Sequence, residues 1–215
     1  MSKTSLQQKY DGVVAYFAEH NPDADTELHF GSEFQLLVAV VLSAQCTDKR
    51  VNMVTPALFA QYPTAEAMAV APVEAIYEKI KSVSYPNSKA SHLSGLSKML
   101  VSDFEGKVPQ TMEELQRLPG VGRKTANVML SVAFEQPAMA VDTHVFRVAH
   151  RLGLVKNAET PLETEKQLVK HIPQDQLRRA HHWLILHGRY VCTARNPQCA
   201  KCGITAFCDY FQGKL

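Results

Sequence analysis

Apolar residues recur along this chain at intervals of three and four, the spacing that places them on one face of an α-helix. Alternation of apolar and polar residues, which would indicate β-strands, never extends beyond a few positions, and no segment repeats along the chain. The pattern therefore predicts an all-α fold, with Pro56 interrupting the helix that contains it. Helices are expected over Leu6–Glu19, Glu33–Ala44, Asp48–Gln61, Thr64–Val70, Pro72–Val83, Ser88–Phe104, Thr111–Leu118, Arg123–Phe134, Thr143–Arg151, Pro161–His171 and Gln174–Tyr190.

Two of the expected helix starts carry the capping-box pattern Thr-x-x-Glu, Thr111 with Glu114 and Thr160 with Glu163. In this pattern the threonine and glutamate side chains each satisfy a backbone N–H at the start of the helix. Because no sheet is available to organise so many helices, we expect two helical lobes. The join between them is placed near residues 136–137, a Gln-Pro pair.

The composition is that of a folded globular chain. Of 215 residues, 46% are hydrophobic and 20% are charged, which excludes the disordered and collagen-like classes. The longest apolar stretch, around Leu36–Leu42, is far shorter than the ~20 residues of a membrane-spanning helix. The first residues contain no apolar core of a signal peptide, so the cytoplasm is the expected compartment.

Charge is distributed unevenly along the chain. The formal net charge is +2, which by itself predicts no strong attraction to a polyanion. Residues 176–215, however, hold six basic residues and one acid, Asp209, whereas the rest of the chain holds 17 basic and 20 acidic residues. This asymmetry indicates one surface that meets an anion.

Four of the five cysteines lie within seventeen residues, in the pattern Cys-x6-Cys-x2-Cys-x5-Cys. Four thiolates so close together, on Cys192, Cys199, Cys202 and Cys208, can share one metal centre. Disulfides are disfavoured because cytosolic thiols stay reduced and pairs this crowded would be strained. Both a zinc ion and a [4Fe-4S] cluster use four cysteines, and the spacing alone does not separate them. The fifth, Cys46, is expected to be a buried small side chain rather than a ligand.

Residues 111–134 predict a helical hairpin with a glycine-rich turn. A capped helix is followed by Leu-Pro-Gly-Val-Gly and then by a second helix that opens with two cations. Gly120, Val121 and Gly122 let the backbone turn tightly with its amides outward, and these amides can bind a phosphate oxygen together with the positive helix end. Such contacts position a duplex without reading its sequence. The alternative is a hairpin that only packs, whereas a Walker loop is excluded because GVGRKT does not fit its pattern.

Lys124 and Asp142 are the candidates for catalysis. Lys124 lies in the first turn of the second helix, where the helix dipole favours the neutral, nucleophilic amine, although a solvated lysine or a phosphate contact is the alternative. Asp142 ends an apolar run before the next helix, and taken alone it is an N-cap. Together, the amine could add at an anomeric carbon while the acid accepts a proton or stabilises the oxocarbenium charge. The resulting Schiff base would allow β-elimination of the phosphate, which cuts the strand.

Several stretches of the chain together resemble the bacterial endonuclease III family, within the superfamily of helix-hairpin-helix DNA glycosylases. They are LLVAVVLSAQCTDKRVN, LPGVGRKTANV, AVDTHVFRV, HHWLILHGRYVC and the four-cysteine pattern. The resemblance runs from about Thr26 to Tyr210. It implies a six-helix lobe over residues 26–136 that carries the hairpin, and a second lobe formed by residues 1–25 and 137–215 that holds a [4Fe-4S] cluster on the four cysteines.

The resemblance also implies an activity. Members of the family release oxidised or ring-saturated pyrimidines from DNA and then cut the strand at the abasic site, as bifunctional DNA glycosylases and abasic-site lyases of base excision repair. Lys124 corresponds to their Schiff-base nucleophile and Asp142 to their catalytic acid. The implied partner is double-stranded DNA with damaged pyrimidines or abasic sites, not a membrane. The protein is expected to act as a monomer in the bacterial cytoplasm, associated with the nucleoid through DNA.

Further positions correspond to the family's contacts with DNA. Members of the family turn the damaged nucleotide out of the duplex and fill the gap with side chains. Gln45 corresponds to the gap-filling glutamine, and Ser43 and Asp48 correspond to positions near the base pocket. Arg195 and Lys201 lie between the cysteines, where family members present a basic loop to the phosphates.

One loop departs from the family pattern. Relatives usually show IGLYNSKA, whereas residues 83–90 here read VSYPNSKA. Tyr85 replaces the aliphatic wedge and can stack on exposed bases, which is worth roughly 1–3 kcal/mol per base. Ser84 replaces a glycine and Pro86 is gained, so we expect a stiffer loop. The departure leaves the lesion range and the preferred opposite base open.

Two other functions are compatible with parts of the pattern. A monofunctional relative would remove a mismatched purine or uracil and stop at the abasic site, but such relatives commonly carry a non-amine residue where this chain has Lys124. A non-catalytic iron-sulfur module that binds DNA and senses redox state would need neither Lys124 nor Asp142. The presence of both residues favours the bifunctional enzyme.

Overall fold

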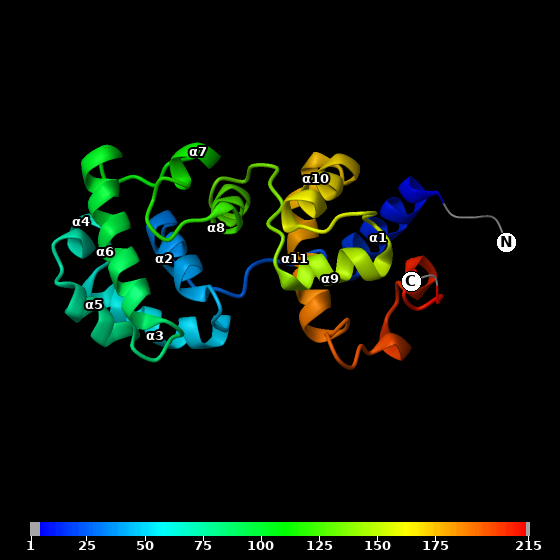
Figure 1. The fold of residues 1–215 in the computed structure, drawn as a ribbon, viewed down its shortest axis with the longest axis horizontal. Helices are drawn as coiled ribbons and strands as arrows, with labels where there is room; N and C mark the ends of the chain where they lie inside the picture. Colours follow the sequence, from blue (N-terminus) through cyan, green and yellow to red (C-terminus); the bar gives the residue numbers. More distant parts are fainter. Residues whose placement is uncertain (1–4, 214–215) are drawn as a thin grey trace. The chain divides into compact units, whose positions relative to one another are not determined.

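The computed structural model describes residues 5–213, and the fold is helical throughout that range (Figure 1). The prediction of an all-α fold is confirmed, since no β-strand occurs between residues 5 and 213. Lys214 of the basic carboxyl-terminal stretch lies outside the described residues. The α-helices are α1 (Leu6–His20), α2 (Glu33–Ser43), α3 (Asp48–Gln61), α4 (Ala65–Ala69), α5 (Val73–Ile80), α6 (Pro86–Asp103), α7 (Met112–Leu115), α8 (Arg123–Val128), α9 (Thr143–Leu152), α10 (Pro161–His171) and α11 (Leu177–Tyr190).

Helix α3 continues through Pro56, so the expected interruption is wrong. A proline inside a helix costs about 3 kcal/mol because it removes one backbone hydrogen bond and crowds the preceding turn. Here the helix is held on both sides of the proline by the buried side chains of Val51, Val54 and Leu58. Burial of this apolar face outweighs the local cost of the proline.

The second helix of the hairpin changes its winding. Residues Arg123–Val128 are α-helical, and Met129–Ala133 continue directly as a π-helical turn. The sequence carries no signal for this change. The helical segment therefore runs without interruption over residues 123–133, and every residue from Thr125 to Val132 is buried.

The two predicted capping boxes differ in their outcome. At α10 the box is complete, because Thr160 Oγ1 accepts from the Glu163 N–H at 3.2 Å and Glu163 Oε2 accepts from the Thr160 N–H at 2.9 Å. At α7 the Thr111 hydroxyl accepts from the Glu114 N–H at 3.3 Å and donates to the Glu114 carboxylate at 2.8 Å, as the Thr160 hydroxyl does to Glu163 at 3.0 Å, but the box is not completed by the Thr111 N–H. The carboxylate is thus held by the threonine side chain instead of by the backbone.

The chain divides into two compact units. One is continuous and spans residues 27–134, from α2 to the end of the hairpin. The other combines the chain up to Thr26 with the chain from Glu135 onward, so it contains α1 together with α9, α10 and α11. In the continuous unit, α2 is buried on nearly all sides, and α4 and α5 both pack against α6.

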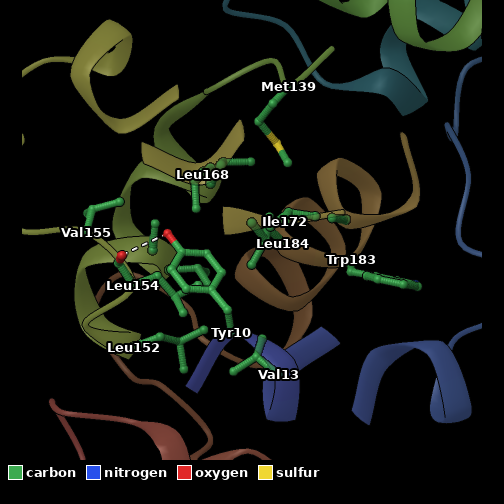
Figure 2. Close-up of a cluster of buried hydrophobic side chains, with 14 of the residues drawn as sticks. Tyr10, Val13, Met139, Leu152, Leu154, Val155, Leu168, Ile172, Trp183 and Leu184 are labelled. Atoms are coloured by element: carbon green, nitrogen blue, oxygen red, sulfur yellow. Dashed lines mark hydrogen bonds between the residues drawn. The ribbon is translucent and has the colours of Figure 1, made fainter. Parts of the chain in front are cut away.

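Figure 2 shows the core of the discontinuous unit, where α1 packs among residues from the other end of the chain. The hydroxyl of Tyr10 donates to the Leu154 carbonyl at 2.8 Å, and burial raises the pKa of this phenol. The indole N–H of Trp183 donates to the Asn21 carbonyl at 2.7 Å. Each buried polar atom in these contacts has a partner, which avoids the desolvation penalty that an unpaired group would carry.

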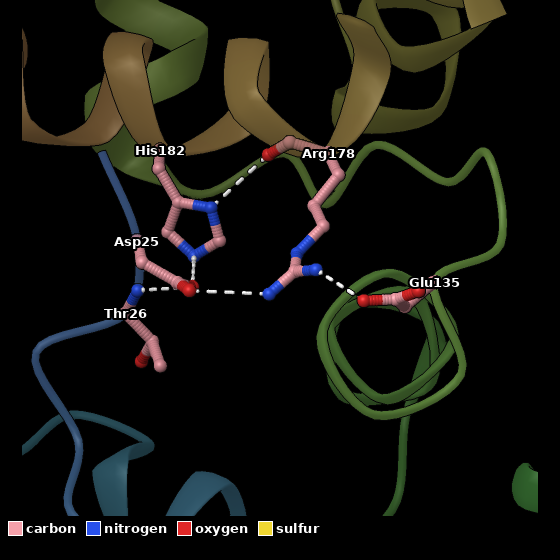
Figure 3. A network of polar contacts seen from close by, with 5 residues as sticks. All are labelled: Asp25, Thr26, Glu135, Arg178 and His182. Carbon is pink, nitrogen blue, oxygen red and sulfur yellow. Dashed lines mark hydrogen bonds and ion pairs between the residues drawn. The ribbon is translucent and has the colours of Figure 1, made fainter. Parts of the chain in front are cut away.

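Arg178 connects the two points at which the chain leaves and re-enters the discontinuous unit (Figure 3). Its guanidinium lies 3.1 Å from Asp25 Oδ2 and 2.8 Å from Glu135 Oε1. Beside it, the buried His182 ring donates from Nδ1 to the Arg178 carbonyl at 3.0 Å. Burial lowers the pKa of His182, the positive charges of Arg178 and Arg189 lower it further, and the hydrogen bond and the Asp25 carboxylate oppose this shift.

Candidate functional site

The turn of the hairpin is built around Gly120. Its φ of +80° lies in the left-handed region, and a Cβ there would approach the His92 side chain to 2.9 Å. Val121 is buried and its N–H donates to the Leu118 carbonyl at 3.1 Å. Gly122 is the N-cap of α8 with φ −92°, which any residue can adopt, and an added Cβ would meet nothing within 4 Å. Of the two glycines, only Gly120 is required by the conformation of the turn.

Lys124 is the second residue of α8, and its side chain is exposed. The residues that follow it are buried, so the helix is fixed against the core while its first turn faces solvent. The amine is therefore presented beside the exposed Gly122 backbone, at the positive end of the helical segment.

Asp142 is the N-cap of α9, in the discontinuous unit. A single carboxylate oxygen, Oδ1, accepts from the backbone N–H of His144 at 2.9 Å and of Val145 at 2.8 Å. The side chain is only half-buried. The carboxylate thus fixes the start of α9 through Oδ1, and this leaves Oδ2 for other chemistry.

Gln45 and Tyr85 share an unusual backbone conformation. Their φ angles are +52° and +56°, in the left-handed region that costs most side chains about 1 kcal/mol or more. Both residues are exposed, and Tyr85 is 65% accessible. Strained, exposed residues at loop tips are characteristic of contact sites. The sequence pattern did not predict either conformation.

Ser43 and Asp48 flank the Gln45 turn. Ser43 is the last residue of α2, and its hydroxyl donates to the Val40 carbonyl at 2.8 Å. Asp48 opens α3 and is half-buried. Both side chains belong to the continuous unit, as Gln45 does.

The four clustered cysteines line one cavity between the end of α11 and the carboxyl-terminal turns. Cys199 and Cys202 bracket a short 3-10 turn, Cys192 follows α11, and Cys208 is buried after a further 3-10 turn. All four, like Cys46, are free thiols. Cys46 lies outside this group, and it is half-buried rather than buried as expected.

This donor set fits an iron-sulfur cluster. A [4Fe-4S] cubane is bound at its corners by four cysteine thiolates, and all four thiols line this one cavity.

Two residues other than the four cysteines approach these sulfurs. The Arg151 guanidinium lies 3.4 Å from Cys192 Sγ and also donates to the carbonyls of Thr193 and Ala194, both at 2.8 Å. His187 Nε2 lies 3.8 Å from Cys202 Sγ, and burial lowers the pKa of this histidine to about 4. No local sequence pattern predicts these contacts. Arg151, for example, is separated from Cys192 by 41 positions.

Burial also raises the pKa of two of the thiols, Cys202 and Cys208. Charge on the neighbouring cysteines raises both values further, whereas backbone N–H groups oppose the shift. Four thiolates are therefore unfavourable together unless a positively charged group binds them.

Arg195 and Lys201 are both exposed on the loops between the cysteines. Arg195 lies between Cys192 and Cys199, and Lys201 directly precedes Cys202. The cysteine-bearing loops thus present two cations to solvent, which is the arrangement expected of a surface that meets phosphates.

Two family models match parts of this chain. A family model described as the HhH-GPD superfamily base excision DNA repair protein matches residues 38–174. A second model, the iron-sulfur binding domain of endonuclease III, matches residues 192–208, which begin and end at the outer cysteines.

Similar proteins cover nearly the whole chain. Endonuclease III of Rickettsia conorii is 50% identical over 199 residues, which cover 93% of this chain and 94% of that protein. Endonuclease III of Escherichia coli K12 is 44% identical over 200 residues, 92% of this chain and 93% of that protein. A solved structure of a trapped covalent endonuclease III–DNA intermediate, an estranged-adenine complex, superposes with a TM-score of 0.92 at 44% identity and covers 97% and 98% of the two chains.

The chain therefore belongs to the endonuclease III family, within the HhH-GPD superfamily of base excision DNA repair proteins. It is a base excision repair DNA glycosylase and abasic-site lyase that binds DNA, and its cofactor is an iron-sulfur cluster, the [4Fe-4S] cluster of this family. Across residues 5–213, no helix combines the length and the apolar character needed to cross a bilayer.

Proposed function

We propose that this chain releases oxidised or ring-saturated pyrimidines from double-stranded DNA and cuts the strand at the abasic site through a Schiff base on Lys124. The observation that carries the proposal is the position of Lys124, exposed in the first turn of α8 directly after the glycine turn. An amine at this place can reach a sugar whose neighbouring phosphate is held by the same turn. The solved relative trapped as a covalent intermediate with DNA supports a covalent route.

The turn over residues 120–122 supplies the phosphate contact. Gly122 is exposed and has open space around the position of a Cβ, although its backbone conformation does not require glycine. A bare backbone at this point lets a phosphate oxygen come close to the amides at the start of α8. Contacts of this kind hold the duplex without selecting a base sequence.

Asp142 carries the acid-base role. Because its N-cap bonds use Oδ1, the orientation of the carboxylate is fixed, and its negative charge can stabilise the positive charge that develops on the sugar. It can also accept the proton that the Lys124 ammonium must lose before the amine attacks. A rigid carboxylate meets this requirement better than a mobile one.

The chemistry proceeds in balanced steps. The neutral Lys124 amine attacks C1′, the bond from C1′ to the base breaks, and the base leaves with that electron pair and takes up a proton. The nitrogen then loses a proton and its lone pair forms the C=N bond of the Schiff base, while the C1′–O4′ bond breaks and O4′ leaves with that electron pair and takes up a proton. Removal of a C2′ proton then expels the 3′ phosphate by β-elimination, and hydrolysis of the imine frees the lysine.

Other exposed residues make the contacts with DNA. Gln45 fills the gap left by the extruded nucleotide, and Tyr85 stacks on the bases opposite it. Ser43 and Asp48 lie at the base pocket. Arg195 and Lys201 on the cysteine-bearing loops bind phosphates.

Cys192, Cys199, Cys202 and Cys208 hold the [4Fe-4S] cluster. When bound, the cluster orders the carboxyl-terminal segment, as structural metal centres do where little apolar core is present. The two cations between the cysteines then have fixed positions for phosphate binding. In this way the cofactor contributes to binding, while Lys124 and Asp142 contribute the chemistry.

The protein acts as a monomer on bacterial nucleoid DNA. Each contact proposed here lies on one chain and is directed at one damaged nucleotide and its flanking phosphates. A second copy of the chain is not needed to complete the site.

The test compares the wild type with Lys124→Gln on a duplex that contains thymine glycol. Base release and strand scission are followed separately, and borohydride is added to reduce any imine to a stable covalent complex. We expect trapping and scission by the wild type and neither by Lys124→Gln. Full-speed scission by Lys124→Gln would refute the proposal, and base release without trapping by the wild type would instead indicate a monofunctional glycosylase.

A further inference from the structure

The turn that carries Gln45 and the loop that carries Tyr85 are joined by hydrogen bonds within the continuous unit. The hydroxyl of Ser84 donates to the Gln45 backbone carbonyl at 2.7 Å. Ser84 directly precedes Tyr85 in the chain. A single short bond therefore ties the loop that carries Tyr85 to the Gln45 turn, and both Gln45 and Tyr85 have left-handed backbones, at φ +52° and +56°.

A second connection comes from Lys89, a buried lysine on α6. Its side-chain amine donates to the Leu42 carbonyl at 2.8 Å and to the Ala44 carbonyl at 2.7 Å. These carbonyls lie at the carboxyl-terminal end of α2, immediately before Gln45, where a cation is favoured by the helix dipole. Burial lowers the pKa of this lysine, with the charge of the nearby Cys46 opposing the shift.

The donors both come from one short segment, residues 84–89, and the acceptors from residues 42–45. Three hydrogen bonds thus span two turns that lie about 40 positions apart in the sequence. Movement of one turn without the other must break these bonds. The strained conformation of Gln45 is therefore supported from the Tyr85 side.

The Ser84 hydroxyl also distinguishes this chain from the loop pattern IGLYNSKA, in which glycine occupies the corresponding position. Glycine has no side chain and cannot donate to the Gln45 carbonyl. The bond between the turns therefore accompanies the replacement of an aliphatic wedge by Tyr85, and a loop with glycine at this position lacks it.

We infer that Ser84 and Lys89 are positioning residues that lock the Gln45 and Tyr85 turns into one arrangement, so that both side chains enter the DNA gap as a coupled pair. This inference rests on the proposed function of Gln45 and Tyr85. Neither Ser84 nor Lys89 is required to touch the substrate. Their effect on lesion recognition passes through the turns that they hold.

The experiment is a double-mutant cycle with the cluster-loaded protein. The quantity measured is the ratio of dissociation constants for a plain duplex and for a duplex with a tetrahydrofuran abasic analogue. Ser84→Ala should lower this ratio about fivefold, the effect of losing one hydrogen bond. In a Gln45→Ala background the same change should have a smaller effect, because the Gln45 side chain that the bond positions is already absent, although its backbone carbonyl remains.

Three further variants separate positioning from general damage. Ser84→Thr keeps the hydroxyl and should restore the ratio, whereas Ser82→Ala, at an exposed serine in the preceding turn, should not change it. Lys89→Met removes both donated bonds with little change in size, and it should lower the ratio more than Ser84→Ala does. Lys89→Arg, which keeps a donor, should recover part of that loss and covers the case in which the methionine variant does not fold.

The outcomes distinguish the inference from the function beneath it. If Ser84→Ala lowers the ratio equally in both backgrounds, or leaves it unchanged in the wild type, the coupling is overturned while Gln45 keeps its role. If Gln45→Ala alone leaves the ratio unchanged, the gap-filling role and the coupling fall together. Borohydride trapping through Lys124 is unaffected by either result, so it reports on the catalytic proposal independently.

Discussion

Replacement of Asp142 by asparagine separates the cap that this carboxylate forms from the catalytic role that we propose for it. Its Oδ1 caps α9 by accepting two backbone N–H groups, at 2.9 and 2.8 Å, and in the proposed mechanism its charge serves the chemistry. Asparagine keeps an oxygen at the same place and is as good an N-cap residue as aspartate. It loses only the attraction between a negative charge and the helix dipole, which is worth roughly 0.3–1 kcal/mol.

We therefore expect Asp142→Asn to lower the free energy of unfolding by about 0.5 kcal/mol. Asp142→Ala loses the cap as well, and should cost about 1–2 kcal/mol. A domain with a stability of roughly 5–15 kcal/mol remains folded in both cases. The glycosylase step, in contrast, should slow by about 10²- to 10⁴-fold in both variants, because neither keeps the acid-base group or its charge.

The assay pairs urea unfolding with single-turnover release of thymine glycol from a duplex. The same variants are then tested for scission of a duplex that already contains an abasic site. We expect the two measurements to rank the variants differently. In stability, Asp142→Asn should be close to the wild type and above Asp142→Ala. In base release, the two variants should be equally slow. Base release by Asp142→Asn within threefold of the wild type would falsify the catalytic role and leave Asp142 as a cap.

Three further predictions follow from other contacts. Gly153→Ala should lower the free energy of unfolding by about 2–3 kcal/mol, measured by urea, because φ is +71° and the new Cβ would collide with the Asp209 carboxylate. His182→Asn should flatten the pH dependence of stability. Because burial lowers the pKa of His182 in the folded state, the stability that its neutral ring contributes is full above pH 6.5 and is lost as the pH falls below that value. Urea midpoints measured above and below pH 6.5 check this. Neutralising Arg195 and Lys201 should reduce the slope of log K against log salt by about two phosphate contacts, as measured by titration of a duplex.

Each of these has a result that contradicts it. Gly122→Ala is the control for Gly153→Ala, because its backbone is extended and its Cβ would be in open space, so equal losses of stability would refute the steric argument. An unchanged pH slope in His182→Asn would mean that other groups set the acid sensitivity. An unchanged salt slope would remove both cations from the DNA interface.

Much of the helical framework could be predicted from the sequence. The apolar period of three and four fixes where each helix has a buried face, and that signal is strong over long segments such as Leu6–His20 and Pro161–His171. The capping box at Thr160 sets a helix start through strictly local chemistry, which is why it appears as expected. The four-cysteine pattern is local in the same sense.

Contacts between distant segments could not be predicted in this way. Nothing around Lys89 indicates that its amine will be buried against the end of α2, because the acceptors are backbone carbonyls, which every residue carries. The approach of Arg151 to Cys192 likewise depends on how α9 packs, not on its sequence. Pro56 was misjudged for a related reason, since the packing of α3 outweighs a local preference.

The discontinuous unit has a consequence for how the protein forms on the ribosome. The continuous segment of residues 27–134 emerges whole and can fold while the rest is still being made. Helix α1 is synthesised before the residues that it packs against. Tyr10 donates to the Leu154 carbonyl, and the Lys9 amine pairs with Asp209 at 2.7 Å. The earliest helix is thus among the last to be secured, and any nascent chain stalled before Asp209 exposes its apolar face to chaperones and proteases.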